Sequence, residues 1–391
     1  MKRVLLVLAV VGSGLAGAAA PAAEPVARGA AMGGAYPTLA GGVEGLWYNP
    51  AMLGSPILGS VGLGLTLQGG NNALTISEFQ GILNDDASAK ADAVQKIRDA
   101  GKWEARIEMA GGAGFTLMGF AIGITPRILV EALNVSPELA QNWLTPGNLA
   151  WLAPNVSHHI TGEVKRSVYN EISVGYAHDL GGLIPGISLA AGGALKYLQG
   201  TDYERFWTNW DIPVLFTGLP LVAGVHERAS KGTGYGADLG LQAGVLGILK
   251  AAVVVKNIGT SIKWDGTVES ADSALSGTNT RSTTGKGNIT QKVPTQVQVG
   301  ASGSIPVVGT SLAAALDVRT NPTETRLRLG AEQSLGLLAF RLGYVTASGP
   351  ETGMVTFGLG VGALVASLDL SAGIAAGGKG GMASASAKVS F

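Results

Sequence analysis

The sequence predicts an all-β fold, a transmembrane antiparallel β-barrel of about fourteen strands, and three observations lead to it. The chain begins with an export signal and afterwards contains no run of 18 apolar residues, so no membrane-spanning helix is expected. Many segments of about ten residues alternate apolar residues with small or polar ones. Long and short connections between these segments also alternate, as in outer-membrane barrels.

The N-terminal residues 1–22 are predicted to be a secretory signal peptide. Met1-Lys2-Arg3 is basic, residues 4–11 are uniformly apolar, and Ala20 and Ala22 place cleavage after Ala22. A single membrane anchor is the alternative, but the apolar run is far shorter than the roughly 20 residues that a spanning helix needs. Because hydrocarbon tolerates only helices and closed barrels, we expect the exported chain in the outer membrane of a Gram-negative-type envelope.

The composition argues against several functional classes. The 391 residues include no cysteine and only 14 % charged residues, against about a quarter in a typical soluble domain. The 27 Lys and Arg balance the 27 Asp and Glu, so no nucleic-acid surface is expected. The four histidines lack carboxylates at metal-ligand spacing, and no nucleophile elbow, phosphate loop or dinucleotide motif occurs. We therefore expect neither an enzyme nor a bound cofactor.

The alternating segments define the expected strands. In one of them, Leu338, Phe340 and Leu342 alternate with Ala339 and Arg341, so one phase would face lipid and the other the lumen. Most of the 60 glycines fall on the lumen phase, where they leave space. The fourteen segments lie near 57–69, 104–117, 120–127, 164–178, 187–199, 232–244, 247–257, 291–303, 310–319, 324–334, 337–347, 353–362, 364–374 and 382–391.

The connections predict the orientation of the barrel. They are long at 70–103, 128–163, 200–231 and 258–290 and otherwise short, which is expected if both termini lie in the periplasm. A soluble sandwich or propeller is the alternative, but it has no reason to alternate its loop lengths. Interfacial aromatic girdles are expected at the strand ends, with Trp103, Tyr197, Tyr235 and Tyr344 at the outer rim and Tyr176 and Phe391 at the opposite one.

Two motifs follow the signal peptide, ARGAAMGGAY at 27–36 and GLWYNPAML at 45–53. They resemble the N-terminal segment of FadL-like outer-membrane transport proteins and of their relatives, the PorV/PorQ-type and TraF-type barrels. Shorter stretches at 255–258, 329–332 and 341–344 look similar too. The resemblance implies a fourteen-stranded barrel, here 57–391, with an N-terminal plug or hatch, here 23–56. It also implies carriage of long-chain fatty acids or aromatic hydrocarbons through a lateral opening.

The resemblance also implies roles for particular residues. Trp47, Tyr48, Asn49, Pro50 and Ala51 would belong to the hatch, with Asn49 hydrogen-bonding its backbone in place. From the residues alone, Asn49-Pro50 is a common turn signal in a segment without lasting alternation. The C-terminal residue would be the assembly signal through which the last strand meets the barrel-assembly machinery. That residue is Phe391, although the preceding positions 387 and 389 are not aromatic.

The predicted outer loops contain helices and an unusual number of apolar residues. Residues 72–101 have helical periodicity, and a second short helix is expected at 136–145. An apolar loop surface marks a ligand groove or a protein contact, although the loops could also pack on each other as a cap. The candidate ligand-binding residues are Trp143, Trp151, Phe206, Trp207, Trp210 and Phe216.

These observations predict a passive outer-membrane channel for hydrophobic molecules. Loops 128–163 and 200–231 would capture the ligand, and a hatch movement near Asn49 would release it. The alternatives are a PorV-like accessory barrel that docks exported proteins and a structural or adhesive barrel with a sealed lumen. The expected partners are outer-membrane lipid, a hydrophobic small molecule and the assembly machinery. Charges on the lumen phase indicate either recognition of a carboxylate headgroup or cross-lumen ion pairs that stiffen the barrel.

Overall fold

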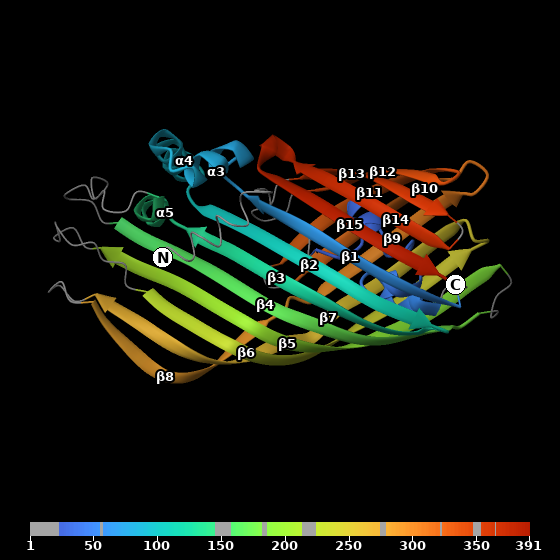
Figure 1. Ribbon diagram of the computed structural model, residues 1–391, viewed down its shortest axis with the longest axis horizontal. Coiled ribbons are helices and arrows are strands. Elements are labelled where there is room, and N and C mark those ends of the chain that lie inside the picture. The colour runs from blue at the N-terminus through green and yellow to red at the C-terminus, as the bar shows by residue number, and fades with distance from the viewer. Residues whose placement is uncertain are drawn as a thin grey trace.

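The computed structural model describes residues 23–54, 58–144, 158–181, 186–212, 224–273, 279–320, 323–346, 353–363 and 365–391. Within these ranges fifteen strands form one antiparallel sheet, and fourteen of them close into a barrel (Figure 1), which confirms the predicted fold. The same residues contain no helix that is long and apolar enough to cross a membrane. The strands are β1 Gly59–Asn71, β2 Trp103–Leu117, β3 Phe120–Val135, β4 His158–Asp179, β5 Ile187–Ile212, β6 Gly224–Val245, β7 Leu249–Ser273, β8 Asn279–Lys292, β9 Gln296–Ile305, β10 Thr310–Arg319, β11 Glu324–Leu335, β12 Leu338–Val345, β13 Met354–Ala363, β14 Ala366–Ala375 and β15 Gly380–Ser390.

The barrel closes because the first strand pairs with the last, in the register that places Ser60 opposite Ser390. Most other strands pair with their neighbours in the chain, but β7 has two successive partners on one side. Its first part pairs with β9 and its last part with β8. β8 and β9 therefore act as one interrupted strand, and Pro294, which has no N–H for the ladder, lies in the break. The predicted strand 291–303 spans this break.

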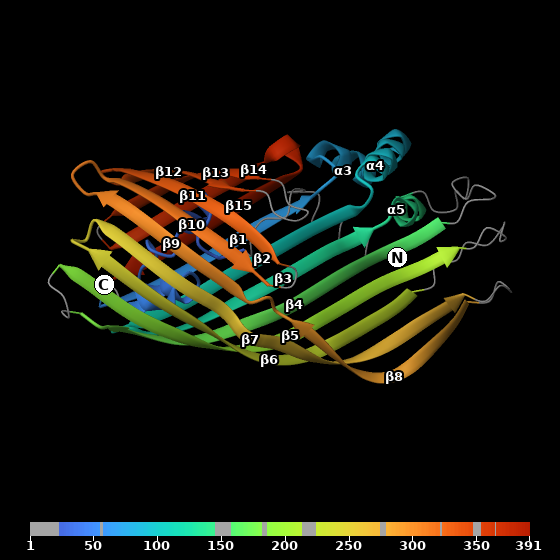
Figure 2. The same cartoon turned by 180° about the vertical axis from the view of Figure 1, so that it is seen from behind.

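Strands extend into three of the predicted long loops and occupy most of two of them, 200–231 and 258–290, which corrects the sequence prediction. β3 and β4 continue into 128–163, β5 and β6 into 200–231, and β7 and β8 occupy most of 258–290. As a result β4 to β8 reach far beyond the ends of β9 to β15 (Figures 1 and 2). We call the end of the barrel with these extensions the outer end, and the opposite end, with the short turns, the inner end.

The two faces of the wall differ as the alternation predicts. Leu63 and Leu65 of β1 are 59 % and 50 % exposed, whereas Ser60 and Thr66 on the other phase are buried. The rings of Tyr197 and Tyr235, both on the exposed phase, lie 5.5 Å apart toward the outer end. At the inner end, aromatic pairs also line the outside of the barrel. These pairs are Phe120 with Tyr176 and Phe115 with Phe391.

The helices of the first two long connections pack on the outside of the wall. α3 (Ile76–Leu83), α4 (Ala87–Asp99) and α5 (Pro137–Leu144) cover the outer ends of β2 to β4. Trp103 lies under Phe79 at a ring distance of 6.0 Å and is only 7 % exposed, so it is not part of an open girdle as predicted. Thr75 caps α3. Burial raises the pKa of the Glu78 carboxyl, but hydrogen bonds from Lys96 and Thr75 outweigh this effect and lower the pKa below its ordinary value.

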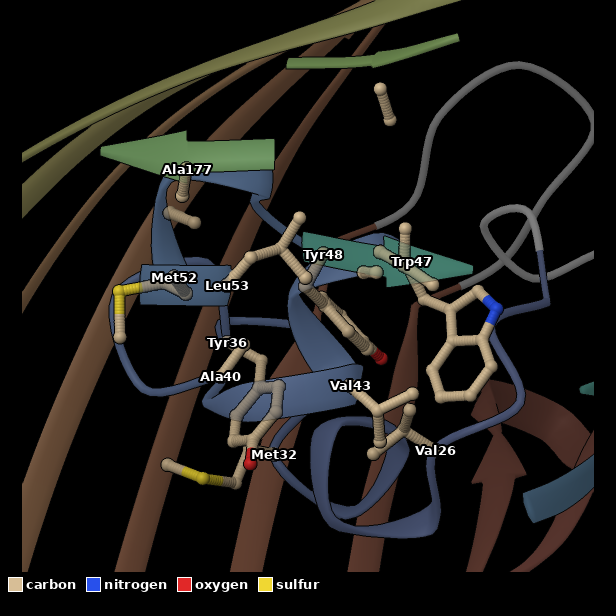
Figure 3. Packing of buried hydrophobic residues seen from close by; sticks show 14 of the residues in the cluster. Val26, Met32, Tyr36, Ala40, Val43, Trp47, Tyr48, Met52, Leu53 and Ala177 are labelled. Carbon is tan, nitrogen blue, oxygen red and sulfur yellow. The ribbon is translucent and has the colours of Figure 1, made fainter. Parts of the chain in front are cut away.

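The N-terminal segment lies inside the barrel as a plug, which confirms this part of the predicted fold. It contains α2 (Ala27–Ala31) and two 3-10 helices, η1 (Gly42–Leu46) and η2 (Pro50–Gly54). α2 packs on β12 to β15 and η2 on β4 to β6, so the plug touches opposite sides of the wall. Its own apolar side chains form a buried core (Figure 3). The labelled members from the plug are Val26, Met32, Tyr36, Ala40, Val43, Trp47, Tyr48, Met52 and Leu53.

Candidate functional site

The hatch motif is fixed by the amide of Asn49, whose side chain is fully buried. Its Nδ2 donates to the carbonyl of Pro37 at 2.9 Å, and its Oδ1 accepts from the backbone N–H of Ala51 at 3.1 Å. The second bond stabilises the first turn of η2, where backbone N–H groups otherwise lack partners. Nearby, Trp47 Nε1 donates to Thr125 Oγ1 on β3 at 2.9 Å. Tyr48 packs edge-on against Tyr36 at 5.0 Å.

Glycines in the wall make room for this motif. A Cβ added to Gly240 would overlap the side chain of Asn49, and one added to Gly192 would overlap the backbone of Pro50. The alternation predicts these glycines on the lumen phase, where they leave space. The structure shows that the space is occupied by the hatch.

Each of the three charged side chains of the plug is paired with the wall. Glu24 forms ion pairs with Lys256 of β7 and, at 3.2 Å, with Arg127 of β3. Arg28 pairs with Glu332 of β11 through two hydrogen bonds of 2.7 and 2.8 Å.

Glu44, the third charged side chain, has one partner in the plug and one in the wall. Tyr36 of the plug donates to it at 2.9 Å, and Lys388 of β15 lies 3.0 Å away. Removing one partner from a buried pair leaves the other charge uncompensated, so these pairs hold the plug in one position.

The wall has further ion pairs of its own. Lys196 Nζ lies 2.7 Å from Asp238 and 3.1 Å from Glu171, on the two strands that flank β5. Arg341 of β12 lies 2.7 Å from Asp369 of β14, and β13 lies between these two strands. These pairs join strands that are adjacent or one strand apart, and they do not cross an open lumen. They therefore differ from the cross-lumen pairs that the sequence suggested, because each links strands on one side of the barrel.

A small polar pocket lies between the plug and the wall. Its free volume is about 40 Å³, enough for only one or a few water molecules. A hydrocarbon chain does not fit in this space while the plug is in place. Its polar lining includes Glu24, Tyr48, Lys256, Gln298 and Arg328.

An aromatic cluster lies further out on the lumen phase, and the sequence prediction missed it because it assigned 258–290 to a loop. Trp264 lies flat against Gly200 and Gly232 on the neighbouring strands, where a Cβ would overlap its ring. Its Nε1 donates to Gln291 Oε1 at 3.1 Å, and the ring of Tyr203 is 5.1 Å away. We call this group the outer aromatic cluster. Its members are Tyr169, Leu198, Tyr203, Ala229, Ile262, Trp264 and Ile289.

The structure describes the side chains of two of the predicted capture residues, and both lie on a strand where a loop was predicted. Phe206 and Trp207 are successive residues of β5, so their side chains point to opposite faces. Phe206 packs against His226 at 6.4 Å, whereas Trp207 is on the phase of the outer aromatic cluster, 37 % exposed, with the Arg205 guanidinium 5.9 Å from its ring. The other candidates lie outside the described residues. This holds for the whole of Trp151 and Phe216, and for the side chains of Trp143 in α5 and Trp210 in β5.

Sequence reasoning also missed most of the plug contacts. Lys256 and Glu332 lie on the lumen phase of their strands, but nothing in the alternation pairs them with Glu24 and Arg28, which are distant in the chain. Arg127 lies at the edge of a predicted strand that in fact continues to Val135. Within the described ranges no three His, Asp or Glu side chains are grouped as metal ligands.

Comparison with known proteins gives a fold likeness without a close sequence relative. No protein-family model matches the sequence, and no curated protein matches it. Among solved structures, the toluene transporter TodX of P. putida is similar with a TM-score of 0.57 and 13 % identity, over 95 % of this chain and 99 % of that one. The toluene transporter TbuX of Ralstonia pickettii gives 0.55 and 14 %, over 95 % and 98 %. A FadL homologue of Pseudomonas aeruginosa gives 0.54 and 11 %, over 96 % and 100 %.

Proposed function

We propose that this chain is an outer-membrane channel for hydrophobic molecules, gated by movement of its N-terminal plug. Two features support the proposal besides the fold that it shares with the toluene transporters TodX and TbuX. The wall has an apolar outer face, and the lumen contains a separately packed segment instead of open water.

The observation that carries the proposal is the way in which the plug is attached. Its core is formed largely by its own side chains, and its three charges are each paired with a specific wall residue. A segment with its own core and few charged attachments can shift as a unit when those attachments break. The small free volume beside the plug means that a ligand passes only after such a shift.

The capture step is assigned to the lumen face of the outer extensions. Trp207 is exposed on the same phase as the buried Tyr203 and Trp264, so an apolar molecule that contacts Trp207 would next meet this cluster. Aromatic rings offer large apolar contact areas to such ligands. Phe206 faces the other way, and we leave it out of the capture site. For Trp143, Trp151, Trp210 and Phe216 the capture role stays a prediction.

A disulfide between the plug and the wall tests the gating step. A Cβ placed on Gly62 of β1 would lie 3.9 Å from the Cβ of Val43 in η1, within the range of natural disulfides. The chain has no cysteine, so a Val43→Cys/Gly62→Cys variant has only this pair. We expect oxidised cells carrying the variant to take up toluene or oleate no faster than cells without the protein, and reduction to restore uptake.

The two single-cysteine variants, treated with the same oxidant, are the controls and should transport at the rate of the unmodified protein. Whole cells are needed because these probes cross simple lipid vesicles without a channel. Undiminished uptake with the plug locked would refute gating by the plug.

Docking of exported proteins is the second candidate, and the tight attachment of the plug favours it. All three plug charges are paired and the pocket beside the plug holds little more than water. If this candidate holds, uptake of both probes is the same with and without the protein, in reduced as well as oxidised cells. The loss of an exported protein from the cell surface when the gene is deleted would then support docking.

A further inference from the structure

The height of the membrane on the barrel can be read from β6. Ten residues separate Val245, at the inner turn, from Tyr235, which is 71 % exposed and packs on Tyr197. At about 3.3 Å per residue and a tilt near 40°, this stretch rises roughly 25 Å, the height of the apolar band of an outer-membrane barrel. Tyr235 therefore marks the outer edge of the hydrocarbon, and residues beyond it on the same face lie at the level of the lipid headgroups.

Three lysines point outward at or just beyond this level, on three adjacent strands. Lys292 of β8 is opposite Ser261, which is itself opposite Tyr235. Lys263 of β7, opposite Thr290, lies one step of two residues further outward than Lys292. Lys231 of β6 lies one such step further outward than Lys263. The three side chains are exposed and form a diagonal line. Diagonal neighbours in a sheet are about 7 to 8 Å apart, so adjacent pairs can contact one phosphate group.

The face of the sheet is fixed by the partners of neighbouring residues. Gln291 and Gly232 contact Trp264 inside the barrel, so Lys292 and Lys231, which follow or precede them, point to the outside. We call Lys231, Lys263 and Lys292 the lysine patch.

No described residue forms an ion pair with Lys231, Lys263 or Lys292, in contrast to many of the buried cations of the wall. Lys196, Lys256 and Arg341 are each paired with buried carboxylates. Asp265 is the one described carboxylate within the patch, opposite Lys231, and it is exposed. Lys286 adds a further exposed cation one step beyond Asn288 on the same face of β8. The patch therefore carries a net positive charge.

We propose that the lysine patch binds the phosphates of a phosphorylated glycolipid in the outer leaflet. Immediately below the patch the same face presents exposed apolar side chains, among them Leu239, Leu241 and Val253. This surface suits a ligand with acyl chains beside the apolar band and phosphates at the headgroup level. Lysines near an anionic lipid surface are attracted to it, and the attraction is strongest within a Debye length. The proposal needs only the membrane-spanning barrel and does not depend on transport.

The test compares binding of a bisphosphorylated glycolipid, lipid A, with that of the same lipid after removal of both phosphates. The full chain in detergent micelles is titrated with each lipid, and bound lipid is counted by native mass spectrometry. For the Lys231→Gln/Lys263→Gln/Lys292→Gln variant, we expect affinity for lipid A to fall roughly tenfold to a hundredfold. Binding of the dephosphorylated lipid should not change.

Two controls separate the patch from net charge and from misfolding. The Lys90→Gln/Lys96→Gln/Lys102→Gln variant loses the same charge from lysines that pair with Asp85, Glu78 and Glu104, and it should bind lipid A normally. Replacing the three patch lysines by arginine should preserve binding. Equal affinity in the glutamine variant and the unmodified protein would overturn the proposal, as would an equal loss in the charge control. Displacement of lipid A by millimolar inorganic phosphate would reassign the patch to free anions and overturn it too.

Discussion

At the scale of single residues, Asn49 makes two buried hydrogen bonds within the plug. The resemblance led us to expect a hydrogen bond from this side chain to its backbone, and the bond to Ala51 N is present at 3.1 Å. The bond to the Pro37 carbonyl could not be predicted, because nothing in the motif indicates that the chain turns back there. A turn signal specifies a local conformation, whereas its distant partner depends on packing.

Replacement of Asn49 by alanine should loosen η2 while leaving the barrel folded. The change leaves one buried N–H and one buried carbonyl without their partners, which costs roughly 2 kcal/mol or more. Hydrogen exchange should therefore accelerate at the amides of 48–54 and stay slow in the strands. Asn49→Asp keeps the acceptor for Ala51 but places a buried carboxylate oxygen against the Pro37 carbonyl, so it should accelerate exchange at least as much. Unchanged exchange in the alanine variant would show that the hatch does not depend on this amide.

Gly240→Ala tests the seat of the hatch in the wall. The added methyl group would overlap the Asn49 side chain, so η2 must move, and we expect the plug to become sensitive to added protease. Gly193→Ala is the matched control, because the nearest atom to its Cβ is 3.4 Å away on a leucine side chain, an ordinary contact. A Gly240→Ala plug as resistant as that of the control would mean that the hatch sits elsewhere.

At the scale of elements, the alternation located strands only where the two faces of the wall meet different surroundings. Within the membrane one face meets lipid and the other the lumen, so Leu239 and Gly240 differ as expected. Beyond Gln199, β5 continues through Thr201, Asp202 and Glu204, which are polar on both phases. These residues carry no period, and they are strand because their backbone groups pair with β4 and β6.

Trp264 should hold the extended parts of β5 to β7 together. Its ring covers two glycines and is 1 % exposed, so Trp264→Ala should cost about 3 to 5 kcal/mol. Thermal unfolding followed by the shift of the folded barrel on a gel should give a lower midpoint. Trp207→Ala removes a tryptophan that is 37 % exposed, and its midpoint should change little. Equal midpoints for the two variants would contradict the stabilising role of the outer aromatic cluster.

At the scale of the whole molecule, the even strand number and alternating connections predicted a closed barrel, because only closure satisfies every strand edge in a membrane. The position of the plug came from a resemblance and not from periodicity. Its attachments join residues such as Glu24 and Lys256, more than two hundred positions apart. A charge on the lumen phase shows that an oppositely charged partner is needed. The sequence does not identify this partner, because several opposite charges on that phase would serve equally well.

Glu24 links the plug to two strands of the wall, β3 and β7, so its neutralisation should open the channel. In Glu24→Gln, Arg127 keeps Glu108 and Glu171 and Lys256 keeps the carbonyl of Trp47, so the wall stays intact while the plug loses two ion pairs. In planar bilayers we expect the unmodified protein to conduct rarely and the variant to open often. Asp92→Asn, which removes an exposed charge from α4, should conduct as rarely as the unmodified protein. If Glu24→Gln stays closed while the Val43–Gly62 disulfide still blocks uptake, the plug gates the channel through contacts other than Glu24.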